Sequence, residues 1–285
     1  MNNILEVMGL NKSYDTFDLK DVSFTLQENC ITGFIGKNGA GKTTTIRALL
    51  GLALKDSGSI RIFGKSADEN EQELKNRIGV VFDEGYFFDD LTISEMKSII
   101  APAYKRWDEK IFKSYMNRFE LNAKQKISTL SKGMRMKYSL ALALSHNADL
   151  LIMDEPTSGL DPLIRGELMD ILLEFMREDG KGVFFSTHIT SDLDKVADMI
   201  ILIDNGKIVF NKDKDSLIDG HGIVKGDKNL LNSDTRKLFL SVKETGYGFT
   251  GITNRKSDVR RLMNGVLFEK PAIEDIMLGY IKEGM

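Results

Sequence analysis

Short runs of apolar residues alternate along the chain with longer segments in which apolar residues recur every three or four positions. The short runs have the length of strands that are buried on both faces, and the longer segments have the periodicity of helices. This alternation predicts an α/β protein whose sheet is mostly parallel. The predicted strands of that sheet are Cys30–Ile35, Ile78–Phe82, Leu150–Met153 and Val183–Ser186.

Two regions depart from this alternation. Near the N-terminus we expect an antiparallel layer of strands over residues 4–10, 22–26 and 59–63. From about residue 85 to 147 the strand pattern disappears, and this region is predicted to be an inserted helical subdomain. The aromatic run Tyr86–Phe88 at its start is interpreted either as the edge of a core or as a partner-docking surface. The expected helices cover residues 91–104, 108–119 and 131–145.

The C-terminal part is predicted to form a separate unit. The mixed-charge stretch Asn211–Asp215 has the composition of a solvated connection. We therefore place one domain at residues 1–215 and a small α/β domain at residues 216–285. The second domain carries no nucleotide or metal motif, so we interpret it as a subdomain that stabilises a dimer or caps the sheet. Its expected helices are residues 234–240 and residues 272–282, the latter next to Pro271, which a helix start tolerates.

Composition and charge limit the possible functions. Of the 285 residues, 42% are hydrophobic and 28% are charged, which is typical of a globular protein. The net charge is −3 and no basic stripe is visible, so nucleic acid is not expected as the main partner. Cys30 is the only cysteine, which excludes an internal disulfide and a cysteine-based metal cluster. We expect no signal peptide and no membrane-spanning helix, because apolar runs such as Met199–Ile203 are far shorter than ~20 residues.

The segment Gly36–Thr43 matches the pattern G-x-x-x-x-G-K-[ST], a glycine-rich loop that binds nucleotide phosphates. It lies between a predicted strand and a predicted helix, as this chemistry requires. The glycines allow successive backbone N–H groups to face phosphate oxygens, and the helix N-terminus adds partial positive charge. Lys42 is expected to bind the β- and γ-phosphates, and the Thr43 hydroxyl to bind Mg²⁺. The other residues assigned to the phosphate site are Gly36, Asn38, Gly39, Gly41 and Thr44.

Acidic and imidazole side chains follow two of the predicted strands. Asp154 and Glu155 come directly after Leu150–Met153, and His188 lies two residues beyond Val183–Ser186. Because the carboxyl ends of parallel strands meet at one edge of a sheet, we expect these side chains beside the phosphate loop. We predict that Asp154 holds Mg²⁺ and that Glu155 polarises the water that attacks the γ-phosphate. His188 is expected to hydrogen-bond to the γ-phosphate.

These motifs occur in a fixed order, with Leu130–Met134 between the phosphate loop and the acidic strand and Asp154–Asp161 continuing beyond it. In this order and at these spacings the chain resembles the nucleotide-binding subunit of an ATP-binding cassette (ABC) transporter over roughly residues 3–215. The element Leu130–Met134 separates this family from other P-loop ATPases. The resemblance implies a P-loop NTPase fold with a RecA-like core, ATPase activity, and ATP and Mg²⁺ as cofactors.

The resemblance also assigns roles outside the phosphate loop. Tyr14 matches the aromatic residue that stacks on adenine, and Phe17 is the alternative. Ser131 and Gly133 match the positions that bind the γ-phosphate of ATP held by a second protomer. Asp161 matches a residue of the loop that crosses the dimer interface. Two subunits, either identical or paralogous, would therefore enclose two ATP molecules head to tail.

Three positions depart from the family pattern. Lys132 and Met134 stand where the family usually has glycine and glutamine, and Lys132 either adds charge near the phosphates or faces water. Asp83 replaces the glutamine that usually links Mg²⁺ and the attacking water to the transmembrane subunit. We assign Asp83 to the metal site, with the adjacent Glu84 as the alternative, because a carboxylate can bind a cation, although it cannot donate an amide N–H.

A subset of bacterial exporter subunits is more similar still. Its members share Ser131-Lys132-Gly133-Met134 and a Trp-Asp pair, here Trp107–Asp108. This similarity implies export of amphipathic peptides or antimicrobials through separate transmembrane subunits, with the ATPase at the cytoplasmic face of the membrane. Two alternatives stay open. One is a non-transport ABC ATPase acting on ribosomes or DNA, which typically has two cassettes, coiled coils or zinc sites, and the other is a nucleotide sensor without turnover.

Overall fold

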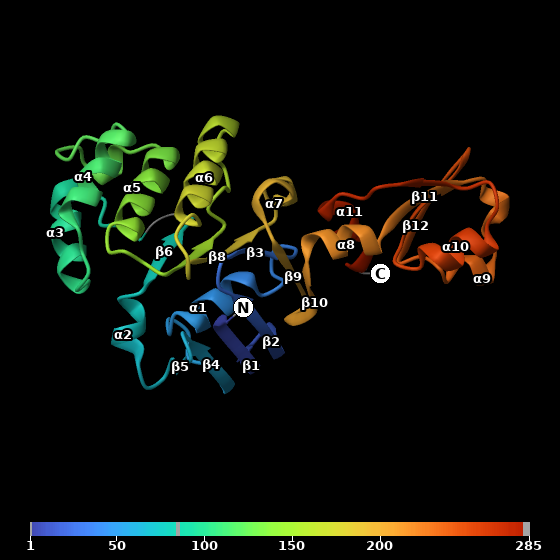
Figure 1. Ribbon diagram of the computed structural model, residues 1–285, viewed down its shortest axis with the longest axis horizontal. Coiled ribbons are helices and arrows are strands. Elements are labelled where there is room, and N and C mark those ends of the chain that lie inside the picture. The colour runs from blue at the N-terminus through green and yellow to red at the C-terminus, as the bar shows by residue number, and fades with distance from the viewer. Residues whose placement is uncertain (1, 84–85, 282–285) are drawn as a thin grey trace.

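A six-stranded sheet forms the centre of the larger lobe in the computed structural model, which describes residues 2–83 and 86–281 (Figure 1). Adjacent strands are parallel, except that β10 and β9 are antiparallel. Every residue of β7 is buried. Burial on both faces explains the unbroken apolar run in its sequence. In spatial order the strands are β10 (Lys207–Asp213), β9 (Met199–Asp204), β3 (Cys30–Ile35), β8 (Gly182–Thr187), β7 (Leu150–Asp154) and β6 (Ile78–Phe82).

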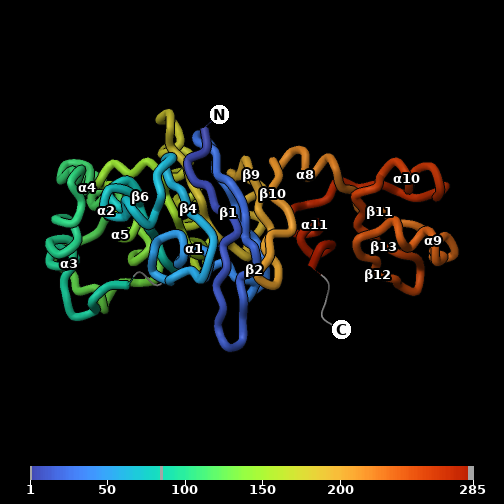
Figure 2. The backbone as a smooth tube through the Cα atoms, turned by 90° about the horizontal axis from the view of Figure 1, so that it is seen from below, coloured from blue at the N-terminus to red at the C-terminus, as the bar shows by residue number. Residues whose placement is uncertain are grey.

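A second, antiparallel sheet packs against one face of the central sheet. The ring centre of Phe24 lies 5.9 Å from that of Phe34 on β3 and 5.6 Å from that of Phe184 on β8. These rings and the aliphatic side chains around them form the core between the two sheets. The hairpin of β1 and β2 extends beyond this core (Figure 2). The strands of this sheet are β2 (Phe17–Gln27), β1 (Asn3–Tyr14), β4 (Ser57–Ile62) and β5 (Lys65–Ser66).

Helices lie between β6 and β7 in the sequence and gather at one end of the larger lobe (Figure 1). Each begins at a polar residue, because Thr92, Asp108 and Ser131 accept hydrogen bonds from N–H groups of the first turn. The buried Tyr138 donates its hydroxyl to the carbonyl oxygen of Ile93 at 2.9 Å, which joins two of the helices. These helices are α3 (Ile93–Ile100), α4 (Glu109–Arg118) and α5 (Lys132–Leu144).

The other face of the central sheet is covered by helices. Leu140 of α5, Leu172 of α6 and Leu193 of α7 share one apolar cluster with Met153 and Phe185 of the sheet. Across the residues that the structure describes, no helix has the length and apolar character needed to span a membrane. The remaining helices of the larger lobe are α1 (Lys42–Leu49), α2 (Glu71–Lys75), α6 (Pro162–Phe175), α7 (Thr190–Val196) and α8 (Lys214–Gly220).

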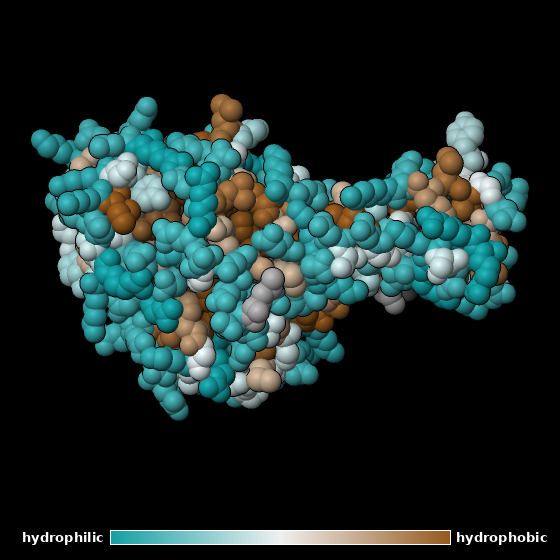
Figure 3. Space-filling view, viewed as in Figure 1, coloured by the Kyte–Doolittle hydropathy of each residue, from teal (hydrophilic) through white to brown (hydrophobic). Residues whose placement is uncertain are grey.

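A smaller lobe contains a third, antiparallel sheet with its own apolar cluster around Val224 and Phe249. Figure 3 shows a narrower region between the two lobes. The last helix returns from the smaller lobe, and its Ile273 and Ile276 are buried in the core of the larger one. The elements of this lobe are β12 (Ser241–Thr245), β13 (Gly248–Thr253), β11 (Gly222–Gly226), β14 (Leu267–Glu269), α9 (Ser233–Arg236), α10 (Lys256–Leu262) and α11 (Ile273–Tyr280).

The predicted fold class is confirmed, with a mostly parallel core sheet, an antiparallel layer and helices between β6 and β7. The predicted domain boundaries stay a prediction. Leu217 of α8 and Ile276 of α11 pack in the core of the larger lobe, so residues on both sides of position 215 share that core. The predicted start of the helical subdomain at residue 85 and Glu84, the alternative to Asp83, lie outside the described residues.

Several predictions about the C-terminal part were wrong in detail. The stretch Asn211–Asp215 is not a loop, because β10 continues to Asp213 and the Asp213 carboxylate then caps α8 by accepting from the Ser216 N–H. The helix expected at residues 234–240 is only the single turn α9, and α10 was not predicted. The final helix expected at residues 272–282 is confirmed as α11, with Pro271 next to its N-cap residue Ala272.

Candidate active site

A cavity of about 820 Å³ lies beside the start of α1 and the carboxyl ends of β6, β7 and β8. This volume falls in the range of ligand pockets, roughly 300–1,000 Å³. Most residues predicted for the nucleotide site line it. Thr16 and Ser158 also line the cavity and were not predicted, since neither belongs to a phosphate-binding pattern. The predicted residues that line it are Tyr14, Phe17, Asn38, Gly39, Gly41, Lys42, Thr43, Thr44, Asp83, Glu155 and His188.

The glycine-rich loop bends sharply at Gly41, which precedes α1 with φ +113°. This left-handed conformation favours glycine, and a Cβ at this position would also collide with Leu19 and Phe17. The Lys42 side chain is 5% exposed, and its ammonium donates hydrogen bonds to the carbonyl oxygens of Gly36 and Lys37, at 2.8 and 3.2 Å. The Lys42 side chain therefore folds back over the backbone of the loop, and its charged end lies at the cavity.

Glu155 joins the two basic side chains of the site. Its Oε1 lies 3.2 Å from Lys42 Nζ, and its Oε2 lies 2.7 Å from His188 Nδ1. The backbone N–H of His188 also donates to Oε2, at 3.3 Å. Glu155 thus stands between the lysine expected to bind phosphate and the histidine expected to contact it. A carboxylate in this position can accept a proton from a water molecule beside the γ-phosphate.

Asp154 lies deeper, at the end of β7, where it is 7% exposed. The Ser186 hydroxyl on β8 donates to Asp154 Oδ1 at 2.6 Å and accepts from the Glu155 N–H at 3.0 Å. Ser186 therefore positions both consecutive carboxylates from the neighbouring strand. The sequence contained a signal for this role, because a polar residue in a strand buried on both faces needs a hydrogen-bonding partner.

The remaining predicted site residues do not line the cavity. Gly36 contributes the carbonyl oxygen that accepts a hydrogen bond from the Lys42 ammonium. Ser131 starts α5, where its hydroxyl oxygen accepts from the Met134 N–H at 3.2 Å. Gly133 is buried in the first turn of the same helix. Asp161 starts α6 and accepts from two backbone N–H groups.

The oxygen ligands near the cavity fit Mg²⁺ that arrives with a nucleotide. Thr43 and Asp83 line the cavity and Asp154 lies behind it, so a hydroxyl and carboxylates are present, which are the hard oxygen ligands that Mg²⁺ prefers. Within residues 2–83 and 86–281, no three acidic, histidine or cysteine side chains are grouped closely enough to hold a metal ion alone. Phosphate oxygens and water would have to complete the coordination.

The two histidines outside this site, His146 and His221, are buried and contact backbone carbonyl oxygens. Burial lowers the pKa of both imidazoles, because desolvation disfavours the charged ring. His146 also stacks on Tyr104, with ring centres 3.9 Å apart. Both histidines belong to the packing of the fold.

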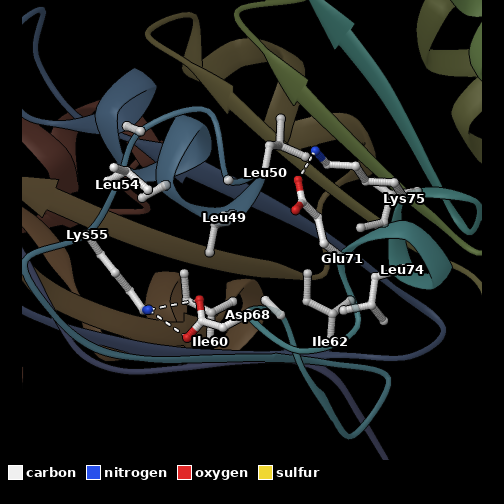
Figure 4. A pocket seen from close by; sticks show the side chains of 15 residues that line it. Leu49, Leu50, Leu54, Lys55, Ile60, Ile62, Asp68, Glu71, Leu74 and Lys75 are labelled. Atoms are coloured by element: carbon white, nitrogen blue, oxygen red, sulfur yellow. Dashed lines mark hydrogen bonds and ion pairs between the residues drawn. The ribbon is translucent and has the colours of Figure 1, made fainter.

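A second cavity, of about 290 Å³, lies between the end of α1, β4 and α2 (Figure 4). Leu49, Ile60 and Leu74 contribute apolar walls, while the ion pairs Lys55–Asp68 and Lys75–Glu71 lie at its sides. None of the predicted nucleotide-site residues is part of its lining. This cavity lacks the glycine-rich phosphate loop, and both of its carboxylates are paired with lysines.

Comparison with known proteins agrees with the geometry of the first cavity. Residues 19–158 match the ABC transporter family. A bacitracin transport ATP-binding protein of Bacillus licheniformis is 34% identical over 73% of this chain and 69% of its own length. This chain belongs to the ATP-binding subunits of ABC transporters. It is therefore an ATPase, and the cavity around Lys42 and Glu155 is its candidate active site.

Other relatives cover more of this ABC subunit or have solved structures. An uncharacterized ABC transporter ATP-binding protein of Bacillus subtilis is 32% identical over 98% of this chain and 89% of its own length. A solved structure described as the ATP-binding subunit of an ABC transporter has a TM-score of 0.69 and 27% identity, covering 76% of this chain and 92% of that one. The similarity thus extends to the whole ATPase lobe.

Proposed function

We propose that this chain is the motor subunit of an exporter and that it dimerises head to tail around two ATP molecules. The observation that carries the proposal is the contact of Glu155 with both Lys42 and His188 in one cavity. A phosphate group entering the cavity would replace the Glu155 carboxylate at the Lys42 ammonium. This frees Glu155 to face the attacking water.

Hydrolysis then follows from the positions of these groups. A water molecule between Glu155 and the γ-phosphorus loses a proton to the carboxylate as its oxygen bonds to phosphorus. The bond between the γ-phosphorus and the bridging oxygen breaks, and ADP leaves with that oxygen. His188, 44% exposed at the cavity, hydrogen-bonds to the γ-phosphate. Mg²⁺, held by Thr43, Asp154 and Asp83, would supply charge neutralisation of the phosphates.

A second subunit would complete the site from the start of α5. Ser131 uses its hydroxyl oxygen as an acceptor from Met134, so the hydroxyl hydrogen is available to donate to a phosphate. The helix N-terminus adds partial positive charge there. Since Ser131, Gly133 and Asp161 do not line the cavity of their own subunit, we assign them to the ATP of a second copy or of a paralogous subunit. A solved cassette of the same fold, 23% identical, is described as a dimer bound to ADP and phosphate.

A membrane subunit is the partner that we propose for four exposed apolar side chains, Leu52, Leu54, Tyr86 and Phe88. These side chains are exposed by 59, 83, 67 and 65%. The Arg47 side chain donates to the Tyr86 hydroxyl at 2.8 Å, which brings the end of α1 beside the segment after β6. Of the aromatic run at residues 86–88, Phe87 packs on Tyr138 in the core, so the run supports both of its interpretations.

The names of relatives support transport as the use of this motor. One relative is a bacitracin transport ATP-binding protein, and another, from Ralstonia nicotianae, is a Nod factor export ATP-binding protein. We propose export of an amphipathic peptide or antimicrobial, with the subunit held at the cytoplasmic face of the membrane by its permease.

Replacement of Glu155 tests the motor chemistry. Glu155→Gln should bind ATP but hydrolyse it at least about 100-fold more slowly, because the amide cannot accept the proton. In the presence of ATP this variant should then accumulate as a dimer, which light scattering detects by its molecular mass. Glu178→Gln, which changes an exposed carboxylate, is the matched control and should keep normal turnover. Near-normal hydrolysis by Glu155→Gln would remove it from this role.

The membrane partner is tested by purification from native membranes. The chain should copurify with an integral membrane protein, and Leu54→Glu should abolish this association while its ATPase activity is kept. Leu278→Glu, at an exposed apolar position on α11, is the control and should not change it. Recovery of the unaltered chain without any membrane protein would contradict the transporter assignment.

A further inference from the structure

An ion pair connects the start of α5 to the candidate active site. Lys132 is the first residue of α5, and its Nζ lies 2.6 Å from Asp83 Oδ1. Asp83 follows β6 and lines the nucleotide cavity, whereas Ser131, next to Lys132, is not part of its lining. The pair therefore links the cavity of one subunit to the helix that we assign to the ATP of another.

The path of the Lys132 side chain depends on a glycine. Its Nζ and Cδ would lie 3.2 and 3.5 Å from a Cβ placed on Gly159, so the lysine stem lies directly over that residue. Gly159 has φ +65° and follows the Glu155 turn. The start of α5, the loop after β6 and the loop after β7 thus meet at one cation.

The charge of each side chain lies in unfavourable surroundings, and the opposite charge of its partner stabilises it there. Lys132 places a cation at the positive end of the α5 dipole, which costs free energy unless an anion lies nearby. Asp83 Oδ1 is buried, and within the described part of the chain it receives no hydrogen bond, so the Lys132 ammonium balances its charge. The two side chains are 40 and 35% exposed, a position in which an ion pair is weak enough to exchange partners.

We propose that Asp83 exchanges Lys132 for Mg²⁺ when the nucleotide binds, so that the ion pair is a switch between the nucleotide-free and nucleotide-bound subunit. This inference rests on the proposed metal-binding role of Asp83. A divalent cation beside the phosphates competes with the ammonium for one carboxylate. Its binding must therefore break the ion pair and release the Lys132 ammonium from Asp83.

The exchange predicts how Lys132 changes nucleotide affinity. Binding of a non-hydrolysable ATP analogue to the full chain is measured by calorimetry with Mg²⁺ and with EDTA. Lys132→Met keeps the apolar stem and removes the competing cation, so it should tighten binding roughly two- to fivefold in Mg²⁺. With EDTA the affinity should equal that of the unaltered chain, because no divalent cation competes for Asp83.

A double-mutant cycle isolates the pair. In an Asp83→Asn background, Lys132→Met should have no further effect, since the competition has already been removed. Lys137→Met is the matched control, because Lys137 pairs with Glu167 at 2.7 Å on the same helix and does not reach the cavity. It should leave both affinities unchanged. Should Lys132→Met fold poorly, Lys132→Gly replaces it in the same measurements.

Specific outcomes overturn the exchange. They are an unchanged affinity of Lys132→Met in Mg²⁺, an equal effect with EDTA, or an effect that persists beside Asp83→Asn. In each of these the analogue still binds, so the nucleotide site itself stands. Failure of the unaltered chain to bind the analogue would instead contradict the proposed function, and the exchange would fall with it.

Discussion

Glu155 combines a strained backbone with a central position in the site. Its φ of +50° lies in the left-handed region, which costs a non-glycine residue about 1–3 kcal/mol. The hydrogen bond from its N–H to Ser186 and the contacts of its carboxylate with Lys42 and His188 hold it in this conformation. Strain of this kind is concentrated at functional residues, in agreement with the role proposed for Glu155.

A buried histidine predicts the pH dependence of stability. Burial lowers the pKa of His146 in the folded protein below its unfolded value of about 6.5. The unfolded chain therefore binds more protons than the folded one once the pH falls below about 6.5, and the free energy of unfolding decreases there. Urea unfolding of the unaltered chain and of His146→Gln at several pH values measures this. The stability difference between them should shrink as the pH falls, and parallel profiles would contradict the assignment.

At the scale of elements, α5 and α6 approach each other closely at a glycine. A Cβ on Gly133 would overlap the Cδ1 methyl group of Ile164 on α6. Both helices begin at residues that the family resemblance assigns to the dimer interface, Ser131 and Asp161. Close packing at Gly133 therefore sets the relative position of two interface segments within one subunit.

This packing predicts a compensating pair of substitutions. Gly133→Ala should lower the free energy of unfolding by about 1–3 kcal/mol, because the new methyl group overfills the helix contact. Ile164→Val lacks Cδ1 and should restore most of that loss in the double variant. Gly166→Ala on α6, where a Cβ would meet no neighbour, should be neutral or stabilising. The free energy of unfolding of each variant is measured with urea. If the effects of Gly133→Ala and Ile164→Val simply add in the double variant, the contact between these two residues is unimportant.

At the scale of the whole molecule, α11 connects the two lobes. Ile273 and Ile276 are fully buried in the core of the larger lobe, while Gly279 approaches Ile252 of β13. His221 follows α8, and its Nε2 lies 3.0 Å from the hydroxyl of Tyr280 on α11. The end of the chain thus stabilises the lobe that carries the active site.

Truncation of a buried side chain on α11 tests this connection. Ile276→Ala should lower the free energy of unfolding by about 2–5 kcal/mol, through lost burial and the cavity left behind. Leu278→Ala, on the exposed side of the helix, should change it by less than about 0.5 kcal/mol. Urea unfolding followed by tryptophan fluorescence reports on the larger lobe, because Trp107 lies there. Equal stabilities of the two variants would contradict a structural role of α11.

The pattern of amino acids was enough to predict the central sheet, the phosphate loop and the residues expected around it. Lys42, Glu155 and His188 were predictable because each follows a strand of one parallel sheet, and parallel strands bring their carboxyl ends to the same edge. The short helices α2 and α10 were not predicted, and the length of α9 was overestimated, since elements of about one or two turns carry too little periodicity.

The contacts between side chains of different elements became visible only in the folded chain. Ser186 between the two carboxylates, Ile164 against Gly133 and Lys132 on Asp83 come from separate elements. The sequence leaves such contacts open because they depend on how helices and strands pack. Lys132 is the clearest case, since the sequence left it either near phosphates or in water. The packing of α5 beside the loop after β6 instead gives it a carboxylate of its own subunit.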